Sequence, residues 1–144
     1  MKLNYKSAAD TEKRRVLLID DEQDVTESLT TNLEATGEFL VRAVNNPLQA
    51  VASAREFKPD VIVLDVVMPG MDGGDVQAAL RADPKLNEIP IVMVTALVSS
   101  NDAGGGSLEA GGVHMLAKPV RLETLVPLLR SQTVADPGPS GNSS

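Results

Sequence analysis

The sequence of 144 residues contains no cysteine and no tryptophan, and it has a single histidine, His114. These absences exclude a disulfide framework, a thiolate nucleophile and metal sites built from cysteine or clustered histidines. No apolar run approaches the roughly 20 residues that span a membrane, and residues 1–15 lack the apolar core of a signal peptide. We therefore expect a soluble, cytoplasmic protein, and we assign no role to His114.

Basic residues are outnumbered, because 13 lysines and arginines stand against 20 acidic residues and give a formal net charge of -7. Binding to nucleic acid or to an anionic membrane requires a basic patch. The charge balance therefore favours proteins or cations as partners, with no nucleic acid and no membrane. The length and the 42% hydrophobic content suit one domain that buries its own core.

Short apolar runs alternate with amphipathic stretches along the chain. This alternation is typical of repeated βα units and predicts an α/β fold, a doubly wound parallel sheet with helices on both faces. Strands that are apolar throughout fit a sheet covered on both sides. The expected strands are residues 16–19, 39–44, 61–64, 91–94 and 113–117.

Apolar residues at helical spacing predict helices after four of these strands. Gly37 and Lys58-Pro59 mark the ends of the first two helices, and Asn45-Asn46-Pro47 marks the start of the second. Pro127 lies within the last helix, which is therefore either kinked or begins late enough to hold Pro127 near its first turn. The apolar stripes are Val25, Leu29 and Leu33; Ala50, Val51, Ala54 and Phe57; Val76, Ala79 and Leu80; and Leu122, Leu125, Val126 and Leu129.

The stretch of residues 100–112 is rich in glycine, and each interior glycine costs a helix about 1 kcal/mol relative to alanine. A fourth helix in this stretch would be short, late-starting or mobile. At the ends of the chain we expect an N-terminal arm over residues 1–14 and a disordered tail over residues 133–144, which is rich in proline, glycine and serine. The folded domain is then residues 15–132.

Chemically distinctive residues follow four of the expected strands: Asp20-Asp21, Asp65, Thr95 and Lys118-Pro119. In parallel sheets, ligands bind outside the carboxyl ends of the strands, so these side chains would converge on one edge. Each has an ordinary interpretation when taken singly, such as acidic residues at a helix N-terminus or Pro119 as a turn former. Independent capping does not predict all four positions together.

Three aspartates at one edge repel one another, so the cluster needs a cation or a protonated member. Carboxylate oxygens select Mg²⁺ or a similar ion, which often binds a phosphate alongside. A neighbouring carboxylate can act as nucleophile and form an aspartyl phosphate, while an ammonium and a hydroxyl bind the oxygens of the transferred group. The sequence supplies one candidate for each part.

With these motifs, residues 15–130 resemble the receiver domains of two-component response regulators. The resemblance depends on Asp20-Asp21, on Asp65 followed by the run from Met68 to Gly73, on Thr95-Ala96, and on Lys118-Pro119. It implies a flavodoxin-like, five-stranded parallel sheet in the order 2-1-3-4-5. The leading hypothesis is a stand-alone receiver, similar to chemotaxis regulators, because only a short tail follows the last expected helix. We do not expect an enzyme.

The resemblance also implies a role for each site residue. Asp65 would accept a phosphoryl group from a histidine kinase or phosphotransfer protein, and Lys118 and Thr95 would contact that group. Asp21 and Asp65 would ligate Mg²⁺ directly, Asp20 would assist, and the backbone carbonyl of Val67 would complete the protein ligands. A downstream protein partner would bind the face formed by the fourth and fifth helices.

Three departures from the family pattern lead to further expectations. Met115 stands where many receivers have an aromatic residue, which predicts a softer switch. The glycines of residues 100–112 predict a fourth helix that is poorly ordered until phosphorylation or partner binding. Val67 and Leu97, two positions beyond Asp65 and Thr95, cannot activate water, which predicts a long-lived acyl phosphate.

Two alternatives remain open. The chain could be a receiver cut from a hybrid kinase or a larger regulator, with the tail as a linker. It could also be a small enzyme on the same fold, either an aspartate-based phosphatase or a flavodoxin-like protein. The run from Asp20 to Asp24 disfavours a phosphate loop after the first strand, and Asp65-Val66-Val67 lacks the D-x-D pair of the phosphatases.

Overall fold

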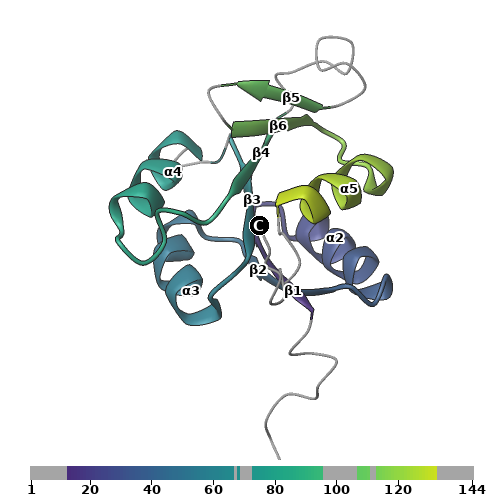
Figure 1. The fold of residues 1–144 in the computed structure, drawn as a ribbon, viewed down its shortest axis with the longest axis horizontal. Coiled ribbons are helices and arrows are strands. Elements are labelled where there is room, and N and C mark those ends of the chain that lie inside the picture. The colour runs from purple at the N-terminus through teal and green to yellow at the C-terminus, as the bar shows by residue number, and fades with distance from the viewer. Residues whose placement is uncertain (1–12, 67, 69–72, 96–106, 111–112, 133–144) are drawn as a thin grey trace, which may run out of the picture.

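The computed structural model describes residues 13–66, 68, 73–95, 107–110 and 113–132 (Figure 1). The expected N-terminal arm and tail lie almost entirely outside these residues. The strands are β1 (Arg14–Ile19), β2 (Phe39–Val44), β3 (Val61–Asp65), β4 (Ile91–Thr95), β5 (Ser107–Ala110) and β6 (Val113–Ala117). The helices are α2 (Gln23–Ala35), α3 (Ala50–Phe57), α4 (Gly73–Ala82) and α5 (Leu122–Gln132), with a short 3-10 helix, η1 (Pro47–Gln49), before α3.

The strands form one sheet in the order β2-β1-β3-β4-β6-β5. All neighbours from β2 to β6 are parallel. These strands are the five predicted from the sequence, and their order confirms the predicted 2-1-3-4-5 arrangement. The parallel core therefore brings the carboxyl ends of β1, β3, β4 and β6 to one edge, as a doubly wound sheet requires.

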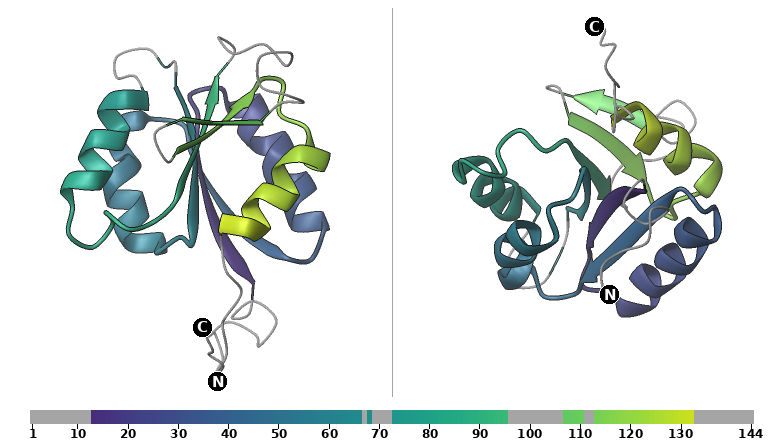
Figure 2. Two further views of the ribbon diagram at one scale, coloured as in Figure 1. Left: turned by 45° about the horizontal axis from the view of Figure 1, so that its top comes forward. Right: turned by 60° about the horizontal axis from the view of Figure 1, so that its bottom comes forward.

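Helices cover both faces of the sheet, with α3 and α4 on one side and α2 and α5 on the other (Figures 1 and 2). Alternate residues of β1 divide between two hydrophobic clusters, because successive side chains of a strand point to opposite faces. Leu17 and Ile19 pack with apolar residues of α3 and α4, whereas Val16 and Leu18 pack with those of α2 and α5. Burial on both faces explains why the strands are apolar throughout.

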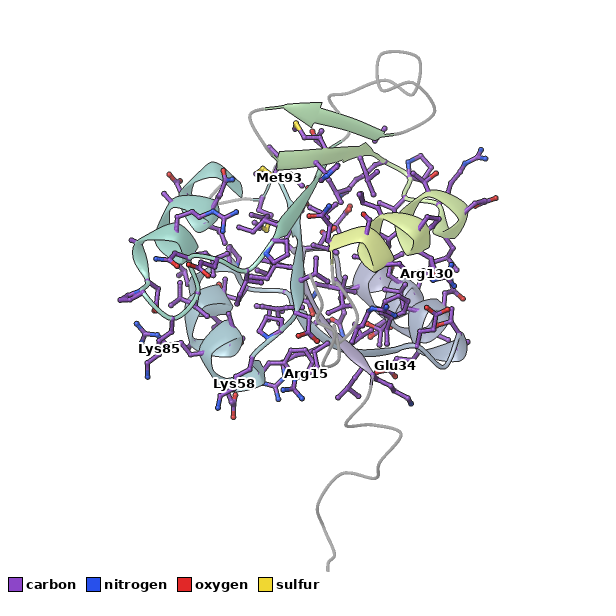
Figure 3. The ribbon with its side chains drawn as sticks, viewed as in Figure 1. Arg15, Glu34, Lys58, Lys85, Met93 and Arg130 are labelled. Carbon is purple, nitrogen blue, oxygen red and sulfur yellow. The ribbon has the colours of Figure 1, made fainter. Side chains whose placement is uncertain are left out.

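The predicted ends of the first two helices and the predicted start of the second are confirmed. Gly37 has φ +81° just beyond α2, a left-handed conformation that glycine adopts without penalty. The Asn46 side chain accepts a hydrogen bond from the amide of Leu48 at the start of η1. Lys58 ends α3 in the left-handed region with φ 57°, and the Arg15 guanidinium beside it donates to the Lys58 carbonyl at 3.1 Å (Figure 3).

The expected fourth helix is wrong for residues 107–110, which form β5. This strand pairs antiparallel with β6, with Ala110 opposite Val113. Gly111 and Gly112 separate the two strands in sequence. Pairing with β6 gives the backbone of β5 its partners, whereas the glycines penalise a helix. Residues 100–106, also part of the expected helix, lie outside the described residues.

Pro127 lies inside α5, which begins at Leu122. The alternative in which this helix begins late enough to place Pro127 in its first turn is therefore wrong. Leu125 and Leu129, on either side of Pro127, are completely buried. The burial of these leucines offsets the backbone hydrogen bond that proline cannot donate. Within the described residues, no helix is both long and apolar enough to span a membrane.

Candidate functional site

Four predicted site residues meet at the carboxyl edge of the parallel strands. Asp20 directly follows β1, Asp65 ends β3, Thr95 ends β4, and Lys118 directly follows β6. Register places Asp65 opposite Val94 and Thr95 opposite Ala117, so these strand ends stop at nearly the same level. The prediction that the residues converge is confirmed, because the apolar strands fix where each polar end lies.

Asp20, Asp21 and Asp65 form an acidic cluster at this edge. One carboxylate oxygen from each residue lies within 4.8 Å of the others. Asp20 and Asp65 are buried, whereas Asp21 is half-buried. Mg²⁺ binds oxygen at about 2.0–2.1 Å, so two ligands on opposite sides of it are about 4.2 Å apart. The cluster thus has nearly the size, and the type of donor, that one Mg²⁺ requires.

The Lys118 ammonium lies among these carboxylates, with Nζ 3.3 Å from Asp20 Oδ2 and 3.3 Å from Asp65 Oδ2. Burial by itself would lower the pKa of Lys118. The hydrogen bond to Glu22 and the negative charges of Asp20 and Asp65 outweigh this effect and raise the pKa above its ordinary value. Lys118 therefore holds its positive charge at neutral pH, beside the carboxylate of Asp65.

Thr95 occupies a buried position beside Lys118. Only 1% of Thr95 is exposed, and its carbonyl accepts a hydrogen bond from the backbone amide of Lys118 at 3.1 Å. The ends of β4 and β6 are thereby tied together. The peptide bond between Lys118 and Pro119 is cis. An ordinary turn-forming role for Pro119 does not account for this cis bond.

Glu22 is a site residue that the sequence analysis did not assign. Its Oε1 lies 3.1 Å from Lys118 Nζ, closer than either aspartate oxygen. Unlike Asp20 and Asp65, the Glu22 side chain is largely exposed. One signal was present in the sequence, because Glu22 directly continues the acidic run at the end of β1.

Asn45 is a second residue whose role at the site was missed. Its Nδ2 donates to the Asp20 carbonyl at 2.9 Å and to Thr26 Oγ1 at 2.9 Å. The Asp20 amide in turn donates to the carbonyl of Val44, the last residue of β2. Asn45 therefore fixes the Asp20 backbone between β2 and α2, although its sequence context predicts only a helix cap.

Gly73 begins α4 directly against the end of β3. A Cβ at this position would lie 2.6 Å from Val66 Cα and 2.7 Å from the Asp65 carbonyl oxygen, distances that real Cβ atoms essentially never show. The Gly73 amide also donates to the Val66 carbonyl at 2.6 Å. Glycine at this position lets α4 begin directly against the backbone of Asp65 and Val66.

A cavity of about 510 Å³ adjoins the acidic cluster between α2 and α5. Its walls are mainly apolar, and Asp20, Asp65 and Lys118 line it together with residues of α2 and with Leu122, the first residue of α5. Met115 is half-buried in β6 and packs against the cluster of α3 and α4. Val67 and Leu97 lie outside the described residues.

Comparison with known proteins gives the same assignment along the whole domain. Residues 16–130 match the family described as the response regulator receiver domain. The chain is 37% identical over 123 residues to the DNA-binding response regulator MtrA of Mycobacterium tuberculosis, covering 85% of this chain and 52% of MtrA. It is 43% identical over 112 residues to the transcriptional regulatory protein PrrA of the same species, covering 78% of this chain and 46% of PrrA. The chain thus spans about half the length of these curated relatives.

Solved structures resemble the same part of the chain. The chemotaxis response regulator CheY4 of Vibrio cholerae has a TM-score of 0.69 at 30% identity, covering 83% of this chain and 98% of CheY4. A receiver domain of a signal transduction histidine kinase from Syntrophus aciditrophicus has a TM-score of 0.69 at 27% identity, covering 91% of this chain and 97% of that domain.

Proposed function

The chain belongs to the family of response regulator receiver domains, and we propose that Asp65 is its phosphoacceptor. The donor would be a phosphorylated histidine of a histidine kinase or phosphotransfer protein. The observation that carries this proposal is the environment of Asp65, which is 3% exposed with Oδ2 3.3 Å from Lys118 Nζ. A buried carboxylate beside a fixed ammonium suits a nucleophile that must hold a transferred anion.

In the proposed transfer, a carboxylate oxygen of Asp65 attacks the phosphorus atom of the donor. A phosphorus–oxygen bond forms and the phosphorus–nitrogen bond to the donor imidazole breaks. The imidazole keeps the electron pair of that bond and takes up a proton. Lys118 offsets the negative charge of the transferred group, and Thr95 supplies a hydroxyl for one of its oxygens.

We assign Mg²⁺ to the cluster of Asp20, Asp21 and Asp65, whose spacing and chemistry suit this ion. Asp21 and Asp65 would be direct ligands, and Asp20 would assist through water. When bound, Mg²⁺ supplies positive charge that neutralises the phosphoryl oxygens. The backbone carbonyl of Val67 stays the predicted additional ligand. The chain's own residues provide the frame, because Asn45 holds the Asp20 backbone and Gly73 permits the close approach of α4 to Asp65.

The phosphoryl donor would bind beside the cavity between α2 and α5, which adjoins Asp65 and has apolar walls. The predicted partner face of the fourth and fifth helices needs correction, because residues 107–110 form β5 and pair with β6. We further propose that a protein recognises the phosphorylated state at α5 and the adjoining strands β5 and β6. In this proposal the domain is a cytoplasmic signalling module and not an enzyme with a separate substrate.

Incubation with acetyl phosphate and Mg²⁺, followed by intact-mass measurement, tests the proposal. We expect the mass to increase by one phosphoryl group in the wild type and in Glu56→Gln, whose carboxylate is exposed on α3. We expect no increase in Asp65→Asn. A persistent adduct in Asp65→Asn would contradict the assignment, as would turnover of a phosphoester without any adduct.

A further inference from the structure

Lys118 contacts three carboxylates that differ in their freedom to move. Asp20 and Asp65 have side chains that are 10% and 3% exposed, whereas the Glu22 side chain is 58% exposed. Moving Lys118 away from a buried carboxylate would take the nearby positive charge from a group that water reaches poorly, which is costly. Water can replace Lys118 at Glu22. Of these three contacts, the one to Glu22 is therefore broken with the least penalty.

Hydrogen bonds hold the backbone of Glu22 in place, but the Glu22 side chain does not cap α2. Its amide donates to Asp20 Oδ1 at 2.9 Å, and its carbonyl accepts from the amides of Val25 and Thr26 in the first turn of α2. The Glu22 side chain makes no capping hydrogen bond to this helix. The carboxylate can therefore turn away from Lys118 without disturbing α2 or Asp20.

We propose that Glu22 is a displaceable anion that occupies Lys118 in the unphosphorylated protein and gives up this position to the phosphoryl group. This inference rests on the proposed function and adds a positioning residue to it. Before the new bond forms, the phosphoryl group of the donor competes for Lys118 with three carboxylates that all lie within 3.3 Å of its ammonium, which has three donors. Asp65 keeps its negative charge until it attacks, and Asp20 is buried. Glu22 is the partner that leaves.

The proposal has a consequence for the rate of phosphorylation. The carboxylate of Glu22 competes with an anionic donor for Lys118 and repels it, so Glu22 slows phosphorylation. Glu22→Gln keeps the size of the side chain but removes its charge. We expect this variant to be phosphorylated about two- to fivefold faster at low donor concentration, the range that corresponds to one exposed ion pair.

The experiment measures the rate of adduct formation over a series of acetyl phosphate concentrations at fixed Mg²⁺. Wild type, Glu22→Gln and Glu27→Gln are compared. Glu27 is an exposed carboxylate of α2 that accepts from Gln23, so its variant changes the net charge equally without touching Lys118. We expect Glu22→Gln to lower the donor concentration at half-maximal rate and Glu27→Gln to leave it unchanged.

The outcomes separate this inference from the proposed function. If the wild type forms the Asp65 adduct but Glu22→Gln is equally fast or slower, Glu22 does not compete and the inference is wrong. An equal gain in Glu27→Gln would also overturn it, because general charge would then explain the effect. If the wild type forms no adduct, the proposed function fails and the inference fails with it.

Discussion

Replacement of Gly73 by alanine adds one methyl group at the point where α4 meets the end of β3. The new Cβ would lie 2.6 Å from Val66 Cα and 2.7 Å from the Asp65 carbonyl oxygen, whereas ordinary contacts begin near 3.4 Å. Both neighbours are backbone atoms at or just beyond the end of β3, so no flexible side chain can move aside. The helix start and the end of β3 must separate.

The magnitude follows from two opposed effects. Forcing an extra carbon into a packed region costs about 1–3 kcal/mol, while alanine in place of glycine in a helix returns up to about 1 kcal/mol. We expect Gly73→Ala to lower the free energy of unfolding by about 1–2 kcal/mol. Gly74, the next residue of α4, is exposed, and Gly74→Ala should be neutral or stabilising.

Urea denaturation followed by far-ultraviolet circular dichroism measures this difference, since the chain has no tryptophan. With a slope of about 1–3 kcal/mol per molar urea, the midpoints of the two variants should differ by about 1 M. Gly73→Ala should also slow phosphorylation, because the Asp65 backbone moves. If Gly73→Ala were as stable as Gly74→Ala and reacted at the wild-type rate, the close approach would not exist.

Three further perturbations test other parts of the structure. The hydrogen bond from the Lys85 amide lowers the pKa of Asp83, and the Arg55 guanidinium adds to the effect. The ionised Asp83 carboxylate therefore stabilises the folded protein above the unfolded pKa of about 3.9, and this stabilisation is lost as pH falls through the lower folded pKa. Unfolding measured from pH 6 to pH 3 should show the destabilisation by Asp83→Asn shrinking with acid, and a constant difference would contradict this. Asn45→Ala removes two hydrogen bonds and should cost about 1–3 kcal/mol in urea denaturation, with a cost near zero counting against its role. Methyl resonances of Met115 should shift gradually on binding of a phosphoryl mimic, whereas unchanged resonances would refute the softer switch.

The strands and the convergence of their ends were predictable because both depend on local sequence. The strands carry apolar residues on both faces of the sheet, such as Val16 on one face and Leu64 on the other. This pattern indicates buried parallel strands. Once the strands are parallel, the fold itself brings Asp65 and Lys118 to one edge. Gly37 and Lys58 have positive φ angles at the ends of their helices. Glycine itself and the proline after Lys58 mark these ends in the sequence.

The remaining features depend on contacts between distant parts of the chain. β5 has only four residues, too few for a periodic pattern, and it exists because β6 offers an edge to pair with. Glu22 and Lys118 are 96 residues apart in sequence, so no local pattern predicts that they touch. Pro127 within α5 is tolerated because tertiary burial of Leu125 and Leu129 outweighs a local penalty.

Identifying the aspartate that carries the phosphoryl group tests the proposed function most directly. The protein is phosphorylated with acetyl phosphate and Mg²⁺, reduced with borohydride and digested, because hydride reduction converts an aspartyl phosphate into homoserine. We predict homoserine at position 65 and at no other aspartate, with none in an unphosphorylated control. Homoserine at Asp20 or Asp21, or none in the phosphorylated sample, would contradict the assignment of Asp65 as the phosphoacceptor.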